Sequence, residues 1–351
     1  MKRTVISILI VLLFGIIVIS ITNMDTTKAA PITLAQTVIN LSQGDSWNSG
    51  ASGVYQTNGH EYRYVGVNVN NYVKFNNDLY QIIGVFDNNS TEVNANLVKL
   101  IRSRSIGSYS WGIFNSSPEY TTYLNYKNDW AGLVTGVPTN ANILLNEYFL
   151  NATDTSATYK SCSDWTYTYG YSYSNAKTED CSKIIKYGIQ SNNLRNYIQP
   201  VTWYLYGYKS TSYSKQNWYQ CERSDGTKIN CTSAYDGAYA TKVTNKKIGL
   251  MYVSDYLYAS GYYASTDTTQ GSQQYYGQQN WLYNGYEWTI APKCDSNVRA
   301  FFVSDGRMND NSTGYSFALR PTFYLKSKVY VTGGDGSFHN PYTIACDTCN
   351  N

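Results

Sequence analysis

The sequence predicts an α+β domain that is mostly antiparallel β with few short helices, preceded by one N-terminal transmembrane helix. Three observations lead to this fold class. Short runs rich in Val, Ile, Tyr and Phe alternate in polarity and are separated by Asn-Asn or Gly signals. The first residues form an uncharged apolar segment, and all seven cysteines follow it. No repeat of fixed period is evident, so we expect residues 46–345 to form one domain.

The N-terminal segment, residues 1–24, is typical of a membrane anchor. Lys2 and Arg3 precede an uncharged run over 4–24, and about 20 such residues span a bilayer as a helix. Positive charge on the short leading side keeps that end cytoplasmic. A cleaved signal peptide is the alternative, with small residues at Thr27 and Ala29. We therefore expect a single-pass cell-membrane protein with an extracellular C-terminal domain, or a secreted protein if the segment is cleaved.

Composition narrows the class of partner. Charged residues make up 15% of the chain, below the roughly 25% of typical domains, whereas aromatic residues reach 16% and include 37 Tyr. Tyr suits half-exposed strands and contact surfaces, although codon bias in an AT-rich genome would also enrich it. The net charge is +3 without a basic block after the first residues. Nucleic-acid binding is therefore not expected.

The cysteines indicate disulfides, because disulfides persist outside the cell. Cys221 and Cys231 flank a Ser-Asp-Gly-Thr turn, and a second pair, Cys162 and Cys181, brackets a polar, Tyr-rich loop. Both pairs are predicted bridges. We expect the terminal Cys-x-x-Cys pair to supply one bridge to Cys294 and one spare thiol. A zinc site would need a second pair of ligands at suitable spacing. The terminal Cys-x-x-Cys pair consists of Cys346 and Cys349.

The first half of the exported chain begins with a spacer over 25–45 and then shows strand patterns. The best soluble helix candidate covers 140–152, with Asn140 or Asn142 as its cap. Residues 153–245 are irregular and read as a long disulfide-bearing insertion. The predicted strands of this half cover 62–67, 72–75, 79–86 and 97–103, with one more at 201–208 inside the insertion.

The second half reads as a strand leading into a short helix over 246–261, followed by strands joined by turns. Ser254 or Asp255 is the expected helix cap. Residues 280–292 and 299–325 are predicted to be strands, with a tight turn at "SDGR" and a loop over 308–315. Pro321 interrupts the last alternating run and suggests an edge strand or a bulge. A closing turn and a short strand complete the domain before a tail at 346–351.

Several of these blocks carry a family resemblance. "IGLMYVSDYLYASG", "AFFVSDGRMN" and "FALRPTFYLKS", within blocks at 54–101, 143–150 and 248–344, resemble surface proteins of low-GC Gram-positive bacteria that carry a domain of unknown function. That domain is similar to the C-type lectin-like fold, which also occurs in formylglycine-generating enzymes and in variable proteins of diversity-generating retroelements. The resemblance implies a C-type lectin-like domain in which 153–245 is the insertion.

No catalytic residue, metal or cofactor is predicted. The two histidines, His60 and His339, lie in polar turn-like contexts, whereas a catalytic base must lie within about 3 Å of its nucleophile. Formylglycine-generating activity would need a cysteine pair, and Cys294 has no near neighbour. Glu287 and Asp305 are weak candidates for paired-carboxylate hydrolysis. The Glu-Pro-Asn and Trp-Asn-Asp triplets of calcium-dependent lectins are absent.

The predicted function is therefore non-catalytic recognition of an extracellular glycan or protein by an adhesin. A structural envelope or pilin-like component is the alternative, and an extracellular enzyme is the second alternative. Residues two apart in a strand share a face, so an aromatic and Asn-rich surface is expected on the Trp-rich strand and the loop that follows. Core packing of Trp288 is the competing interpretation. The candidate ligand-binding residues are Trp281, Tyr283, Tyr286, Trp288, Asn309, Asp310, Asn311 and Tyr315.

Overall fold

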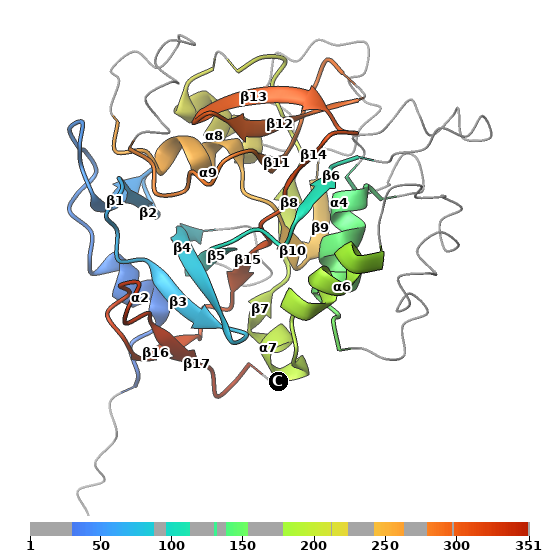
Figure 1. The fold of residues 1–351 in the computed structure, drawn as a ribbon. Coiled ribbons are helices and arrows are strands. Elements are labelled where there is room, and N and C mark those ends of the chain that lie inside the picture. The colour runs from blue at the N-terminus through green and yellow to red at the C-terminus, as the bar shows by residue number, and fades with distance from the viewer. Residues whose placement is uncertain are drawn as a thin grey trace, which may run out of the picture. The chain divides into compact units, whose positions relative to one another are not determined.

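The computed structural model shows an α+β arrangement of mostly antiparallel strands with few short helices (Figure 1), which confirms the predicted class. The chain divides into two units, residues 1–32 and residues 33–351. No helix in the described ranges is long and apolar enough to cross a membrane, and the predicted anchor lies outside them. The structure describes residues 30–87, 96–112, 130–131, 138–153, 178–211, 213–223, 242–262, 279–296 and 298–349.

The larger sheet of the second unit has eight strands in the order β1-β2-β4-β5-β15-β10, with β3 paired to β4 and β7 paired to β15. All of these pairings are antiparallel. The four strands predicted between residues 62 and 103 are present as β2 to β5. The strands are β1 (Gly53–Thr57), β2 (Glu61–Val65), β3 (Tyr72–Phe75), β4 (Asp78–Asp87), β5 (Asn96–Arg102), β7 (Ile198–Gln199), β10 (Ile248–Gly249) and β15 (Thr322–Leu325).

Two tight hairpin turns follow from local sequence. Asn76 and Asn77 connect β3 to β4 with φ values of 54° and 56°, and Asp305 and Gly306 form a second turn with 47° and 75°. Positive φ at both central residues is the signature of the type I′ turn, which matches the twist of the flanking strands. Asn, Asp and Gly tolerate this region best. The predicted "SDGR" turn is thus confirmed.

The smaller sheet has five strands in the order β13-β12-β11-β14-β6. The predicted loop over 308–315 is wrong at its start, because a strand runs to Ser312 and pairs residue by residue with its neighbour. The predicted strand over 280–292 begins only at Glu287, after a turn in which Gly285 has a φ of 83°. The strands are β6 (Ser108–Ser110), β11 (Glu287–Pro292), β12 (Arg299–Ser304), β13 (Arg307–Ser312) and β14 (Ser316–Ala318).

The segment around Pro321 carries the chain from one sheet to the other. β14 belongs to the five-stranded sheet and β15 to the eight-stranded sheet. The carbonyl of Pro321 accepts a hydrogen bond from the Arg102 amide at 3.0 Å. Proline lacks an amide donor, so it fits between two strands rather than within one. The predicted interruption therefore marks a crossover between sheets.

The described helices are short, and α2 corrects a prediction. α2 lies inside the predicted spacer, yet Leu34, Ala35 and Val38 are buried and the Leu34 amide bonds the Val329 carbonyl at 2.8 Å. The domain therefore begins earlier than residue 46. The helices are α2 (Leu34–Ile39), α4 (Asn140–Ile143), the π-helix η2 (Leu144–Phe149), α6 (Thr178–Tyr187), α7 (Asn192–Tyr197), α8 (Lys215–Arg223) and α9 (Val253–Tyr258).

The helix caps differ from those expected. Thr139 caps α4 and accepts a hydrogen bond from the Asn142 amide at 3.4 Å, so the predicted Asn caps lie inside the helix. For α9, Tyr252 occupies the N-cap position, and Asp255 accepts from the Tyr252 amide at 2.9 Å. Asp255 therefore closes the cap from within the first turn, as the residue at helix position N3 does in a capping box.

α8 and α9 lie between the two sheets (Figure 1). On one side, the ring centroids of Trp218 in α8 and Phe301 in β12 are 4.8 Å apart. On the other side, Asp255 of α9 contacts Lys99 of β5 and pairs with Arg63 of β2 at 3.0 Å. Because α8 and β7 belong to the predicted insertion, its described part contributes directly to the core.

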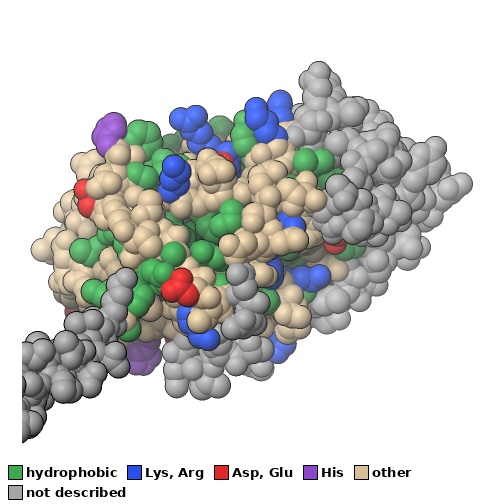
Figure 2. All heavy atoms as spheres, turned by 90° about the horizontal axis from the view of Figure 1, so that it is seen from below, with side chains coloured by type: hydrophobic (Ala, Val, Ile, Leu, Met, Phe, Trp, Pro, Cys, Tyr) green, Lys and Arg blue, Asp and Glu red, His purple; other side chains and the backbone are tan. Residues whose placement is uncertain are grey.

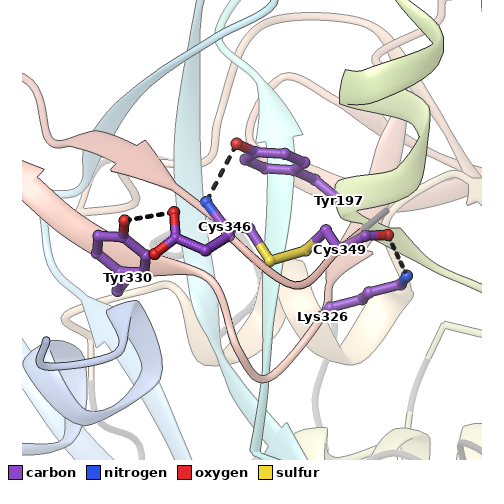
Figure 3. The surroundings of a disulfide bond; sticks show 6 residues. Tyr197, Lys326, Tyr330, Cys346 and Cys349 are labelled. Carbon is purple, nitrogen blue, oxygen red and sulfur yellow. Dashed lines mark hydrogen bonds between the residues drawn. A yellow bond between two sulfur atoms is a disulfide. The ribbon is translucent and has the colours of Figure 1, made fainter. Parts of the chain in front are cut away.

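Two ribbons complete the described fold, β8 (Val201–Tyr204) with β9 (Lys242–Lys246), and β16 (Tyr330–Gly333) with β17 (Thr343–Ala345). Beyond β17, Cys346 and Cys349 are bonded to each other, with Cα atoms 5.5 Å apart (Figure 3). Such a separation is usual for a disulfide. The expected bridge from this pair to Cys294 is therefore wrong, although Cys294 is itself disulfide-bonded.

The C-terminal disulfide loop is also tied to the core, which corrects its prediction as a tail. The Cys346 amide donates to the Tyr197 hydroxyl at 3.1 Å, and Lys326 donates to the Cys349 carbonyl at 3.0 Å (Figure 3). The Tyr330 hydroxyl donates to Asp347 at 2.9 Å. These contacts join the last residues to α7 and β16.

Candidate functional site

The two predicted tryptophans belong to the interior. Trp288 is fully buried and its indole N–H donates to the Tyr109 carbonyl at 3.0 Å. Trp281 is half-buried and donates to the Tyr64 carbonyl at 2.8 Å. A buried indole needs such a partner, so both rings serve packing. The competing interpretation of Trp288 as a core residue is confirmed.

A set of stacked rings replaces the predicted row. Phe317 lies 4.3 Å from Phe302 with an interplanar angle of 8°, and 6.4 Å from Tyr315 with an angle of 9°. The ring of Tyr286 lies 6.0 Å from Phe317. Tyr286 and Tyr315 are 50% and 58% exposed, whereas Phe302 is buried. We call these four residues the ring stack; it joins β11, β12 and β14 at the surface.

Hydrogen bonding fixes one member of the ring stack. The Tyr286 hydroxyl donates to both carboxylate oxygens of Asp305 at 3.1 and 3.2 Å. This bond to a negative acceptor raises the pKa of Tyr286 above its ordinary value. Asp305 therefore forms the turn between β12 and β13 and positions the Tyr286 ring. Tyr283 is 38% exposed in the turn before β11.

The three predicted polar residues of β13 do not share one face. Asn309 pairs with Phe302 and Asn311 with Ala300, so both asparagines lie on the face of the ring stack. Asp310 points to the opposite face, where it contacts Arg299 and lies 3.3 Å from Lys293. Asn309 and Asn311 therefore lie beside the ring stack, whereas Asp310 does not.

A polar cleft of about 690 Å³ forms a second candidate site, which the sequence analysis missed. Ligand pockets commonly have volumes of about 300–1,000 Å³. Side chains reach the cleft from the β3–β4 hairpin, from residues 102–105 after β5, and from residues 186–190 at the end of α6. Asn284 and Phe338 complete it. The only sequence signals are the Asn-Asn turn and the Arg-Ser-Arg-Ser run.

Two buried side chains hold the walls of the cleft together. Asn76 donates to the Gly188 carbonyl at 2.8 Å and accepts from the Gln190 amide at 2.9 Å. Arg102 pairs with Asp78 at 2.6 Å and donates to the carbonyls of residues 104 and 105 at 2.7 and 2.8 Å. Each wall is therefore fixed by bonds that need no ligand.

The remaining acid candidate, Glu287, is internal. It is buried beside Arg320, whose Nε lies 2.8 Å from both carboxylate oxygens. Burial raises the pKa of Glu287, although the guanidinium acts in the opposite direction. Arg320 also donates to the Leu282 carbonyl at 2.7 Å. This pair stabilises the turn before β11 and lies away from solvent.

The described residues hold no group of three or more His, Cys, Asp or Glu side chains that could bind a metal ion. Cys221 is a buried thiol whose pKa is raised by that burial. Its predicted partner, Cys231, lies outside the described residues, as do Cys162 and the side chain of Cys181. Because Cys221 is a thiol in this structure, the predicted bridge from it to Cys231 is wrong. The bridge between Cys162 and Cys181 stays a prediction.

The ring stack and the polar cleft are built from different residues and offer different chemistry, flat exposed rings in one and charged and amide groups in the other. Comparison with protein-family models, with curated proteins and with solved structures finds no match to this chain.

Proposed function

We propose that this chain is a cell-surface ligand-binding or adhesion protein that recognises an extracellular glycan or protein without catalysing a reaction on it. The ring stack carries the proposal. Tyr286, Tyr315 and Phe317 lie at the surface; Tyr286 and Phe317 pack against the buried ring of Phe302, and the Tyr315 ring lies nearly parallel to that of Phe317. Rigid rings suit the apolar faces of sugars and the aromatic centres of protein interfaces. Asn309 and Asn311 beside them supply amide donors and acceptors.

The proposed scaffold is a distant C-type lectin-like domain. Its support is the resemblance of the sequence blocks and the order in which the elements follow one another. Strands β2 to β5 come first, then α4 with η2, then the Trp-bearing β11, and then β15 after its Arg-Pro pair. Such a scaffold presents a binding surface on strands and turns that packing holds rigid.

The proposed location is the outer face of a cell membrane, with the chain anchored by its N-terminal segment. The uncharged run over 4–24 supports an anchor. The bonded Cys346 and Cys349 support an oxidising compartment. Lys and Arg side chains are scattered over the face in Figure 2 and form no continuous basic patch on its coloured part, which supports a glycan or protein partner over a nucleic acid.

The test is binding of the full-length chain, kept in mild detergent, to a glycan array and to bacterial and host cells. The double variant Tyr286→Ser/Tyr315→Ser should bind at least roughly thirtyfold more weakly, because truncating interface hot spots costs about 2 kcal/mol or more. Leu41→Ser, at a site that is 45% exposed beyond α2, is the matched control. Unchanged binding by the double variant contradicts the proposal. Filaments of the full-length chain would favour the structural envelope alternative.

A further inference from the structure

The polar cleft has a lining that suits a hydroxyl-rich ligand better than an apolar one. Five of its side chains are amides and three are aromatic rings, whereas Leu79 is its aliphatic member. Ordinary small-molecule pockets are mostly apolar with few polar groups. Amides offer both donors and acceptors, which is what the hydroxyl groups of a sugar require. The amides are Asn76, Asn77, Gln81, Gln190 and Asn284.

The charge of the cleft is positive. Arg102 is paired with Asp78, and both belong to the wall. Arg104 and Lys186 also line the cleft, are exposed, and form no ion pair with any residue the structure describes. Two cations without a carboxylate partner in one cleft favour a ligand that carries negative charge.

The rings of the cleft lie next to these charges. Tyr187 receives the guanidinium of Arg102 over its ring at 4.4 Å, and the ammonium of Lys186 lies 5.8 Å from the same ring. Tyr72 meets Phe338 edge to face at 5.4 Å. Phe338 is 55% exposed. A large exposed ring at the rim of a polar cleft is available for the apolar face of a sugar.

The cleft is preorganised. Asn76 joins the hairpin turn to residues 188–190, and Gln190 donates its side-chain amide to the carbonyls of Ile185 and Gly188 at 2.8 and 2.9 Å. The acceptor oxygen of that amide keeps its hydrogen-bonding capacity. A site whose walls are already fixed loses little conformational entropy on binding.

From this combination we propose that the cleft binds an acidic saccharide, with its carboxylate or phosphate held by Arg104 and Lys186 and its hydroxyl groups held by the exposed amides Asn77, Gln190 and Asn284. Tyr187 and Phe338 supply the faces against which the sugar rings lie. The site shares no residue with the ring stack, so variants in the two sites can be tested separately.

The test is titration calorimetry on the full-length chain in detergent with three probes of similar length. One is an oligomer of alternating glucuronic acid and N-acetylglucosamine, one is an oligomer of N-acetylglucosamine units joined by phosphodiesters, and one is a neutral oligomer of N-acetylglucosamine. We expect a charged oligomer to bind, the neutral one to bind at least roughly tenfold more weakly, and added salt to weaken the binding. The charged oligomer that binds more tightly identifies the carboxylate or the phosphate as the ligand group.

Variants assign the binding to the cleft. Arg104→Gln/Lys186→Gln should lose roughly tenfold or more in affinity, because hydrogen bonds to charged groups are lost. Lys74→Gln is the matched control, since Lys74 is exposed on the same hairpin and outside the cleft lining. Unfolding midpoints should be equal, because all three residues are at the surface. Equal binding of the neutral oligomer, or a double variant that binds like the control, would overturn the proposal, whatever the ring-stack variants do.

Discussion

Replacing Asp255 with Asn tests whether the buried charges beneath α9 hold that helix between the two sheets. The Asp255 carboxylate contacts the Lys99 ammonium and accepts from Arg63 Nη1 at 3.0 Å. Asn has the same shape and can still accept from the Tyr252 amide, which lies at 2.9 Å, but it carries no charge. Arg63 then keeps Glu61 at 2.9 Å. Lys99 is fully buried and loses the carboxylate that its ammonium contacts.

We expect Asp255→Asn to lower the free energy of unfolding by about 3–5 kcal/mol, the usual cost of removing one partner from a buried ion pair. Adding Lys99→Met should restore at least about 2 kcal/mol, because replacing both partners by groups of similar volume is often close to neutral. The assay is urea unfolding of the full-length chain in detergent, followed by the fluorescence of tryptophans such as Trp203, whose ring lies 5.3 Å from the ammonium. A cost below about 1 kcal/mol for Asp255→Asn, or a double variant whose cost is the sum of the single costs, would refute the reasoning.

Three further predictions follow from burial. Trp288→Ala should lower the free energy of unfolding by about 3–5 kcal/mol because the ring is fully buried, whereas Tyr315→Ala should change it by less than about 0.5 kcal/mol; equal losses in urea titrations would contradict the core assignment. Burial raises the pKa of Tyr80 above its ordinary value of 10.0, while an unfolded tyrosine ionises near 10. The free energy of unfolding should therefore decrease as the pH rises above about 10, and Tyr80→Phe should reduce that slope; an unchanged slope counts against the assignment. Burial also raises the pKa of the Cys221 thiol well above 9.0. Iodoacetamide at about pH 8, with no reductant present, should therefore label Cys221 only after the chain is unfolded. Mass spectrometry reads the label, and an unfolded chain that resists labelling carries the bridge to Cys231 instead.

The parts of the fold that the sequence predicts well are those determined by neighbouring residues. β3 alternates in burial, β4 is a nearly continuous buried run, and the two meet at an Asn-Asn turn, so strand and turn chemistry agree. β13 was missed because "RMNDNS" is polar and shows no strand pattern. It forms because the Asp305 turn brings it back along β12, where their backbone groups pair. α2 was missed for a related reason, since its short apolar stretch acquires partners only when β4, β5 and β16 pack against it.

The candidate sites were less predictable, because exposure depends on which elements cover a strand. Trp288 in β11 and Tyr286 in the turn before it both pack against Phe317, yet only Tyr286 is exposed. Nothing local distinguishes the two, since the neighbouring ring, Phe317, comes from a strand 30 residues later in the chain. The residues that line the polar cleft are still farther apart in the sequence. It brings Tyr72 to Phe338, which no spacing in the sequence indicates.

The abundance of tyrosine carries less weight for function than its position does. Many of the tyrosines lie in the core, and several of them, such as Tyr80, Tyr252 and Tyr256, are fully or almost fully buried. Tyr252 shows what such a residue does, because its hydroxyl accepts from the Tyr204 amide at 2.9 Å and its ring lies 4.2 Å from the Lys99 ammonium. These rings therefore serve as packing groups with a polar end. A Tyr-rich composition would arise from such a core whether or not the protein binds sugars. Recognition would then depend on the few rings that are exposed and grouped together, and those are the rings that the variants above remove.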